Sequence, residues 1–373
     1  MERTNRHAHV NFVESDALAG GRAGRILAVL VHHAAQWSNG QAIQEVMLHA
    51  VVMHEFGSPA VLCPGEFPDP AARPGWVTVA LRASALNWHD VLVRQGRYGS
   101  PLPHIIGADG AGVRTDTGEE VVVLPSLNWG GRDDAPSTRW EILGDHTRGT
   151  YAELVSVPAD CLAPKPQGMS WAEAAALPLV GVTTYRALFV RGRLRAGESM
   201  LVIGAGGGIA TMAISLAVAA GAGITVTSSS ADTIERAVAA GARGGVLHSE
   251  PDWPVHARAM SPNNAGFDLI LDPVGRWSES IRALRPGGRL VVLGANAAET
   301  AKMDIRSFYF GQFDLLGTTM GSSRDFAGLL NMIDRCSVGA PVIDREFPLD
   351  GAAEAHEHLE RGRTFGKCVL VHD

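Results

Sequence analysis

Hydrophobic residues follow two different patterns along the chain, and the change between them comes near Trp171. From Val51 to about Val157, apolar residues form short runs broken by glycine and proline, as in an all-β, barrel-like domain. The expected strands of this part are 48–53, 77–83, 120–124 and 151–157. Beyond Trp171, helical patterns alternate with further strands, which are expected at 199–203, 224–227, 267–271 and 289–293. This alternation predicts a parallel sheet with helices on both faces.

The two ends of the chain differ from these regions. Residues 1–46 show no sustained hydrophobic period, so we expect an N-terminal extension that is poorly ordered. The last part of the chain contains one expected helix, 326–335, and two expected strands, 346–347 and 368–371. These are too few to bury a core of their own, and we expect them to complete the first domain. The segment 285–288 is expected to end a helix and lead into the next strand.

A glycine-rich loop between an apolar strand and a helical pattern is the strongest motif in the chain. Its residues are Gly204, Ala205, Gly206, Gly207, Gly208 and Ile209. The spacing fits G-x-x-G-x-x-A at Gly204, Gly207 and Ala210, with another strand expected after the helix. Such glycines let the backbone turn tightly and approach a phosphate, while the helix N-terminus offers free N–H groups. The loop therefore predicts a site for the pyrophosphate of a dinucleotide, and the alternative is a glycine-rich hairpin without a ligand.

Composition limits the classes of partner. The chain has 373 residues, of which 46% are hydrophobic and 19% charged, as expected for one or two buried cores. The net charge is -7 and no basic run occurs, which favours small-molecule partners over nucleic acid. The four cysteines are far apart and form no C-x-x-C pair, so we expect neither a disulfide framework nor a thiolate metal site, and a cytoplasmic location. The apolar run 26–31 is too short to span a membrane.

Several segments, which follow one another in the same order as in the family, resemble the medium-chain dehydrogenase/reductases. Within that family they resemble the zinc-free, quinone oxidoreductase-like branch. The segments that carry the resemblance are 83–90, 106–112, 149–153, 176–188, the glycine loop, 285–288 and 366–369. The resemblance covers about residues 47–373 and implies an α/β architecture. A GroES-like β-barrel catalytic domain at 47–170, completed by 319–373, would be joined to a Rossmann doubly wound parallel sheet at 171–318. It also implies a homodimer that pairs through the strand near 315–319.

The resemblance places this chain outside the zinc-dependent enzymes of the family. Those enzymes carry a ligand cysteine where this chain has Asn87, and a Gly-His-Glu triplet where it has 107–109, with Ala108 in place of the histidine. The lobe at about 125–149, which normally holds four cysteines for a structural zinc, contains none. A catalytic zinc needs three good protein ligands. We therefore expect no zinc at either place.

Without a metal, simple alcohol oxidation loses its usual stabilisation of the alkoxide. Hydride transfer to an enone or a quinone instead places negative charge on a conjugated oxygen, which hydrogen-bond donors can stabilise. This is also the activity that the zinc-free relatives imply. Two alternatives stay open: a metal-free carbonyl/alcohol oxidoreductase, and a non-catalytic protein that binds NADPH.

Three residues are candidates for the reaction itself. Asn87 supplies an amide donor to the pocket, caps the helix that begins at Trp88, or does both. His89 is a candidate proton donor, with a packed or solvated histidine as the alternative. Tyr98 is expected at the mouth of the pocket, either as a phenol donor or as a rim aromatic. Two nearby groups are expected to be structural, Asp90 in an ion pair with Arg94 four residues later and Asp109 in hydrogen bonds.

Other residues are candidates for cofactor binding. The second Rossmann strand ends in Ser228, Ser229 and Ser230, where NAD enzymes carry an acidic residue. Hydroxyl groups there admit the 2′-phosphate, so NADPH is the expected cofactor, with NAD as the alternative. The resemblance implies that Lys367 reaches a cofactor phosphate, and a surface lysine is the alternative. Further candidates are Thr183, Thr184, Gly294 and Asn296.

Overall fold

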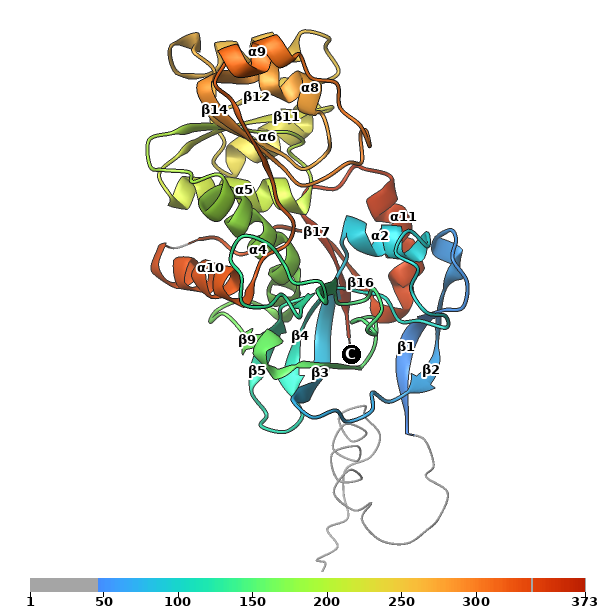
Figure 1. Cartoon of the computed structure of the whole chain (residues 1–373). Coiled ribbons are helices and arrows are strands. Elements are labelled where there is room, and N and C mark those ends of the chain that lie inside the picture. Colours follow the sequence, from blue (N-terminus) through green and yellow to red (C-terminus); the bar gives the residue numbers. More distant parts are fainter. Residues whose placement is uncertain (1–45, 337, 373) are drawn as a thin grey trace, which may run out of the picture. The chain divides into compact units, whose positions relative to one another are not determined.

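Two large sheets organise the protein in its computed structural model, which describes residues 46–336 and 338–372 (Figure 1). The expectation for the N-terminal extension lies outside these residues, apart from Val46. The first sheet is mostly antiparallel. Its strands, in spatial order, are β16 (Ile343–Pro348), β17 (Lys367–Val371), β3 (Trp76–Ala85), β4 (Asp109–Arg114), β5 (Glu120–Val123) and β9 (Leu162–Pro164), with β8 (Leu154–Pro158) also paired to β3.

The long strand β3 shows why this sheet forms. Val79, Leu81 and Ala83 are buried while Ala80 and Arg82 are partly exposed, which is the two-residue period of a strand with one apolar face. The C-terminal strand β17 pairs antiparallel with β3, so the end of the chain belongs to this first sheet. Smaller antiparallel pairs flank it: β1 (Met47–Met53) with β2 (Leu62–Pro68), and β6 (Ser126–Leu127) with β7 (Glu141–Ile142).

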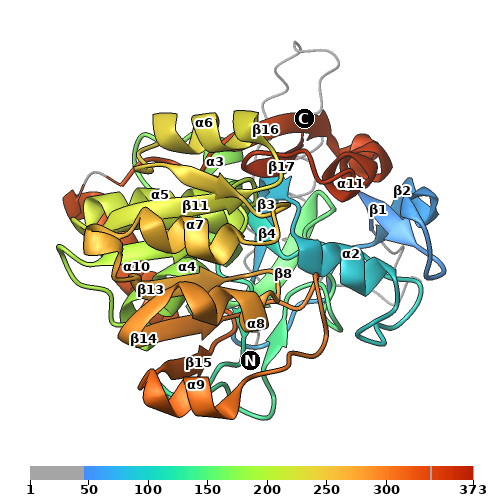
Figure 2. The ribbon, with the colours of Figure 1, turned by 90° about the horizontal axis from the view of Figure 1, so that it is seen from above.

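The second sheet is entirely parallel. Its spatial order is β12 (Gly245–Leu247), β11 (Gly223–Ser228), β10 (Ser199–Val202), β13 (Phe267–Asp272), β14 (Leu284–Val292) and β15 (Asp314–Gly317). Strand order reverses between β10 and β13, and ligands of doubly wound sheets bind at such a switch point. The β10 residues Met200 and Val202 belong to one apolar cluster, whereas the neighbouring Leu201 belongs to another. Both faces of the sheet are therefore covered, as Figure 2 shows from above.

Helices and short helical turns complete the architecture. The α-helices are α2 (Trp88–Arg94), α3 (Trp171–Ala176), α4 (Pro178–Tyr185), α5 (Gly208–Ala219), α6 (Ala231–Ala239), α7 (Trp253–Ala259), α8 (Trp277–Ser280), α9 (Ile305–Phe310), α10 (Ser323–Cys336) and α11 (Ala352–Glu360). The shorter turns are η1 (Pro59–Val61), η2 (Ala159–Cys161), the π-helical η3 (Arg186–Arg191), η4 (Pro262–Asn264), η5 (Ile281–Ala283) and η6 (Leu349–Gly351). Among the described residues, no helix combines the length and apolar character needed to cross a bilayer.

The parallel sheet and the mostly antiparallel sheet confirm the predicted fold class, but two details differ from the sequence expectation. Residues 285–288 lie inside β14 rather than at a helix end. There the pairing with β13 shifts register between Phe267 and Leu269, and Gly287 has a φ of 72°. Helix α11 was not predicted, and three of its four apolar residues are alanines, which mark a helical period only weakly. The described residues form one compact unit, so the domain boundaries at 170 and 318 stay a prediction.

A buried arginine anchors the lobe at about 125–149, which has little regular structure of its own. The Arg186 guanidinium donates a hydrogen bond to the Asp133 carbonyl at 2.7 Å and to the Asp325 carboxylate at 2.9 Å. Its cationic carbon also lies 4.9 Å from the centre of a Trp129 ring. These contacts connect the lobe to η3 and α10 through one side chain that is almost fully enclosed.

Candidate functional site

Asp109 is fully buried at the start of β4, and three donors bond its carboxylate while a fourth bonds its backbone carbonyl. Its Oδ1 accepts a hydrogen bond from the Leu179 backbone N–H, in the first turn of α4, at 2.7 Å. Its Oδ2 accepts from Asn87 Nδ2 at 2.9 Å and from Lys367 Nζ at 3.1 Å. The Asp109 carbonyl accepts from the Thr150 hydroxyl at 2.8 Å. Asp109 therefore has the structural hydrogen-bonding role that its sequence context predicts.

Lys367 is buried beside this carboxylate. Its ammonium donates to the Leu86 carbonyl at 2.6 Å, to Asn87 Oδ1 at 2.5 Å and to Asp109. All three ammonium protons thus have protein acceptors, and a cofactor phosphate would have to displace one of them. The lysine stem still touches the glycine loop, because a Cβ at Gly208 would come within 2.8 Å of Lys367 Cδ. The surface lysine considered from the sequence is not what the structure contains.

Asn87 is the N-cap residue of α2, and its side chain also belongs to the site. The Asn87 amide bonds Asp109 and Lys367, whereas its backbone N–H donates to Asp90 Oδ2 at 2.8 Å. Asp90 therefore caps the helix from inside its first turn. Asn87 occupies the N-cap position, although its side chain makes no cap hydrogen bond. Its amide bonds within the cluster, and its expected role as a donor to the pocket stays a prediction.

The expected ion pair between Asp90 and Arg94 is not formed, and this expectation was wrong. Arg94 points toward α11, where its guanidinium lies 2.7 Å from Glu360 Oε1 and 3.5 Å from His356 Nδ1. Asp90 instead accepts from the Tyr151 hydroxyl at 3.4 Å. Tertiary packing brings other partners within reach of both side chains. The four-residue spacing of Asp90 and Arg94 along the helix therefore does not decide which residues they pair with.

Burial controls the protonation of Asp90 and of His356. Burial raises the pKa of Asp90 to about 6, although His89, the Asn87 N–H and Lys367 each lower it in part. Asp90 Oδ1 is buried and has no hydrogen-bond partner among the described residues. Burial, followed by the nearby Arg94 charge, lowers the pKa of His356 to about 3, so this imidazole is neutral at physiological pH.

His89, in the first turn of α2, lies against Tyr98 and Asp145. The His89 and Tyr98 rings make an edge-to-face contact with centroids 4.7 Å apart. His89 Nε2 lies 2.7 Å from Asp145 Oδ1, an ion-pair contact that lacks the alignment of a hydrogen bond. Burial, and then the Asp145 charge, raises the pKa of the exposed Tyr98 phenol. Sequence reasoning missed Asp145, because it stands in the irregular lobe without any motif around it.

The glycine loop has the open shape that a dinucleotide requires. Gly204 has a φ of 86°, and Gly207 precedes the first turn of α5. A Cβ at Gly207 would meet no atom within 4 Å, so this point of the loop faces open space beside the free amides of the helix N-terminus. By contrast, Gly206 is covered, since its carbonyl accepts from the Gly366 N–H at 2.9 Å. The loop residues therefore fit a pyrophosphate at Gly207 and the N-terminus of α5.

The remaining cofactor candidates occupy different surroundings. The buried Ser228 hydroxyl accepts from the Ser230 N–H at 3.1 Å, whereas Ser229 is exposed. The Thr183 hydroxyl donates to a methionine sulfur, and the buried Thr184 Oγ1 has no hydrogen-bond partner among the described residues. Near the ends of β13 and β14, a Cβ at Gly294 would lie 2.0 Å from the Pro273 carbonyl oxygen, while Asn296 is exposed. Inside the loop, Ala205 is buried and Ile209 is half-buried.

A histidine that sequence reasoning missed lies behind the serines. His248 Nδ1 is 3.1 Å from Thr227 Oγ1, and this oxygen also accepts from the Gly204 N–H at 3.0 Å. Burial, and then the Arg276 charge, lowers the pKa of His248. Its place directly after a strand of the parallel sheet was the signal that could have identified it.

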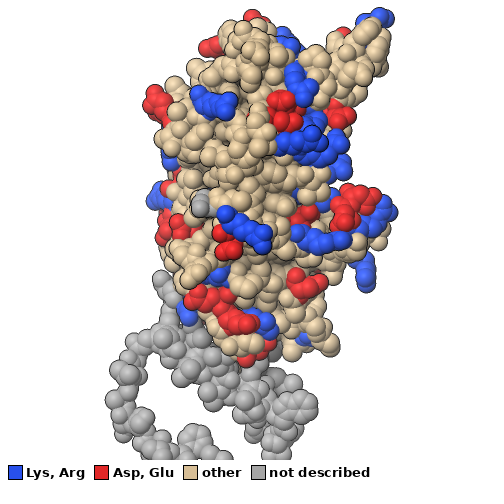
Figure 3. All heavy atoms as spheres, turned by 90° about the vertical axis from the view of Figure 1, so that its left-hand side faces the viewer, with Lys and Arg blue, Asp and Glu red and all other residues tan. Residues whose placement is uncertain are grey.

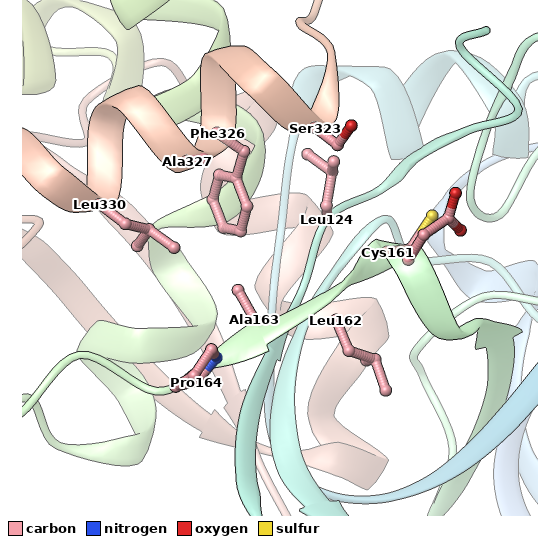
Figure 4. A pocket seen from close by; sticks show the side chains of 10 residues that line it. Leu124, Cys161, Leu162, Ala163, Pro164, Ser323, Phe326, Ala327 and Leu330 are labelled. Atoms are coloured by element: carbon pink, nitrogen blue, oxygen red, sulfur yellow. The ribbon is translucent and has the colours of Figure 1, made fainter.

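A cavity of about 330 Å³ lies elsewhere, between β9 and α10 (Figure 4). Its wall is mainly apolar and includes Leu124, Phe326 and Leu330. None of the predicted site residues lines it. We therefore assign the candidate site to the Asp109 cluster and the glycine loop rather than to this cavity.

Comparison with known proteins identifies the class. Residues 73–167 match the family model described as the alcohol dehydrogenase GroES-like domain, and residues 208–335 match the one described as zinc-binding dehydrogenase. The chain belongs to the medium-chain dehydrogenase/reductase superfamily, which confirms the predicted family.

Three relatives illustrate the range of this superfamily. A zinc-type alcohol dehydrogenase-like protein of Schizosaccharomyces pombe is 31% identical, over 87% of this chain and 99% of its own length. A quinone oxidoreductase of Mus musculus is 29% identical, over 88% and 99%. A solved NAD-dependent alcohol dehydrogenase is 36% identical with a TM-score of 0.81, over 87% and 99%. The shared activity is that of an oxidoreductase acting on small molecules.

Replacing Asp90 by asparagine tests the buried carboxyl. Because the pKa of Asp90 is higher in the folded than in the unfolded chain, its contribution to stability is complete below about pH 4 and is lost as the pH rises through about 6. Relative to Asp90→Asn, the unfolding free energy of the wild type should therefore fall by up to about 3 kcal/mol across this interval. Urea unfolding from pH 4 to 8 measures it, with the exposed Asp334→Asn as control. Parallel pH curves for wild type and Asp90→Asn would contradict the assignment.

Proposed function

We propose that this protein is a zinc-independent oxidoreductase that prefers NADPH and transfers hydride to an enone or a quinone. The hydrogen-bonded cluster of Asn87, Asp109 and Lys367 carries the proposal. The resemblance places a zinc-ligand cysteine at position 87, where this chain has an amide. The Lys367 ammonium lies 2.5 Å from that amide oxygen and 3.1 Å from the neighbouring carboxylate. A fixed monocation beside these oxygens disfavours a divalent ion among them.

The glycine loop and His89 would supply the groups for the proposed reaction. Bound NADPH would supply the hydride, with its pyrophosphate at Gly207 and the N-terminus of α5. Negative charge that develops on a substrate oxygen is stabilised by a hydrogen-bond donor or neutralised by a proton. His89, which lies 2.7 Å from Asp145, would hold the proton that the reduced substrate accepts. Asp145 would orient the ring, and Tyr98 would cover its edge.

Two observations bear on the alternatives. The relative named quinone oxidoreductase supports the proposed substrate class. The relatives named alcohol dehydrogenases, one of them zinc-type, support the carbonyl/alcohol chemistry of a second candidate, a metal-free carbonyl/alcohol oxidoreductase, but not its independence of metal. A non-catalytic NADPH-binding protein is the third.

NADPH consumption by chelator-treated protein, measured with a panel of enones, quinones and aldehydes, tests the proposal. We expect turnover with enones or quinones that does not rise when zinc is added. His89→Gln should lower kcat by about 100-fold at unchanged NADPH affinity, because only proton transfer is removed. Asp145→Asn should also lower kcat. Its control is Asp134→Asn, at an exposed position of the same lobe. Activity that is restored only by zinc would contradict the proposal. Turnover of aldehydes alone would support the second candidate, and NADPH binding without turnover would support the third.

The preference for NADPH rests on the end of β11. Ser228, Ser229 and Ser230 present hydroxyl groups and no carboxylate there, and Ser229 is exposed. A carboxylate would repel the 2′-phosphate and bind the ribose hydroxyls of NADH. Ser229→Asp should therefore lower the ratio of kcat/KM for NADPH over NADH by roughly tenfold or more. Ser323→Asp, which adds the same charge on α10, should leave the ratio unchanged, and an unchanged ratio in Ser229→Asp would argue against this site.

We also propose a homodimer that forms along β15. This strand pairs only with β14 among the described strands, so its other edge has no partner in the sheet. On the adjacent α9, the side chains of Ile305, Tyr309 and Phe310 are 77%, 49% and 69% exposed. Light scattering should give twice the chain mass for the wild type and the single mass for Phe310→Asp. Val255→Asp, another exposed apolar position, should stay dimeric, and a monomeric wild type would refute the proposal.

The surface and the cysteines support the remaining parts of the proposal. On the face drawn in Figure 3, basic and acidic side chains lie intermingled, without a broad basic area that would attract nucleic acid. Cys63, Cys161, Cys336 and Cys368 are free thiols. Free thiols are typical of a reducing compartment such as the cytoplasm.

A further inference from the structure

Three side chains of the kinds that bind transition metals converge beside β17. Asp344, His358 and Cys368 come from β16, α11 and β17, and each offers one ligand atom. These atoms all lie within 4.8 Å of one another. We propose that this Asp–His–Cys cluster is a binding site for a divalent ion of the zinc type.

An irregularity in β16 places the carboxylate. The pairing of β16 with β17 shifts register between Ile343 and Arg345, and Asp344 is the residue at the shift. Asp344 Oδ1 accepts a hydrogen bond from the Phe365 N–H at 2.8 Å, while Oδ2 lies 2.8 Å from His358 Nε2. The backbone thus fixes one carboxylate oxygen and leaves the other beside the imidazole and the thiol.

The donor set selects the class of metal. Zinc binds thiolate, imidazole and carboxylate at about 2.0–2.3 Å, so its ligand atoms lie roughly 3–4 Å apart in a tetrahedral site. To reach that geometry, Asp344 Oδ2 and His358 Nε2, which lie 2.8 Å apart, need to separate slightly, and Cys368 Sγ needs to approach them by about 1 Å. Three protein ligands leave a fourth position for water. A soft thiolate excludes magnesium and calcium, which prefer oxygen ligands.

The cluster is accessible, and its protons can be accounted for. The side chains of Asp344 and His358 are 12% and 23% exposed, so an ion can enter from solvent. Burial, with the Asp344 charge, raises the pKa of the Cys368 thiol to about 11, while Lys367 and Arg345 lower it in part. The metal-free thiol therefore keeps its proton. Binding forms the metal–sulfur bond, releases that proton to solvent, and places a cation between two negative ligands.

This site is distinct from the one proposed for catalysis. Successive side chains of β17 point to opposite faces of the sheet, so Cys368 points away from the side occupied by Lys367. Cys368 belongs to the apolar cluster around β1 and α11 rather than to the Asn87 cluster. Metal bound at the Asp–His–Cys cluster therefore neither requires nor excludes zinc-independent hydride transfer at the other site.

Cobalt provides a direct probe, because a cobalt–thiolate bond has a characteristic near-ultraviolet charge-transfer band. Chelator-treated full-length protein titrated with Co²⁺ should develop this band at one equivalent, and added Zn²⁺ should remove it. Cys368→Ser should abolish the band, and His358→Gln should weaken Co²⁺ binding at least tenfold. The control is Cys161→Ser, a buried thiol outside the cluster, which should keep the band.

The band separates this site from other metal binding in the chain. The histidines of residues 1–45 and the Asn87–Asp109 position include no cysteine, so metal bound there gives no thiolate band. Circular dichroism of each variant shows that it is folded, and the partly exposed His358→Gln is the safer of the two substitutions. No band in the wild type, or a band that persists in Cys368→Ser, overturns the proposal.

Discussion

The arrangement of this protein depends on the hydrogen bonds to the buried carboxylate of Asp109. A buried charge is costly unless donors surround it, and the donors here come from Asn87, Leu179 and Lys367. These residues belong to the loop before α2, the first turn of α4 and the C-terminal strand β17. Satisfying one carboxylate thus sets the positions of three segments that are far apart in the chain. Because the Lys367 stem also packs against Gly208, the same contact extends to the glycine loop.

Two buried carboxylates near this point differ in the number of hydrogen-bond donors around them. Asp109 has a hydrogen-bond donor on each oxygen and an ammonium within reach. Asp90 receives the Asn87 N–H and a long contact from Tyr151 on one oxygen, while the other has no partner among the described residues. Burial therefore raises the pKa of Asp90 to about 6. The site combines one carboxylate that has donors on both oxygens with one carboxyl group that takes up a proton in the mildly acidic range.

The lobe at 125–149 has little regular structure, and one buried guanidinium and two aromatic rings hold it in place. Arg186 bonds two elements and stacks on Trp129, whose ring also lies edge-to-face against Trp140. Guanidinium hydrogen bonds and aromatic packing thus provide the connections that this lobe needs. The lobe in turn places Asp145 beside His89, which connects its anchoring to the proposed proton donor.

Local patterns in the sequence determined the two kinds of sheet, the strand–glycine–helix loop, the cap at Asn87 and the family. Each depends on residues that are neighbours in the chain, so hydrophobic period and glycine spacing were sufficient. Only the tertiary structure decided the partners of the charged side chains: Arg94 with Glu360, Lys367 with Asp109, and Asp145 with His89. It also decided the register shift in β14 and the convergence of the Asp344 cluster. Ion pairs and strand registers are chosen among all groups that folding brings within a few ångströms, and no local spacing records that choice.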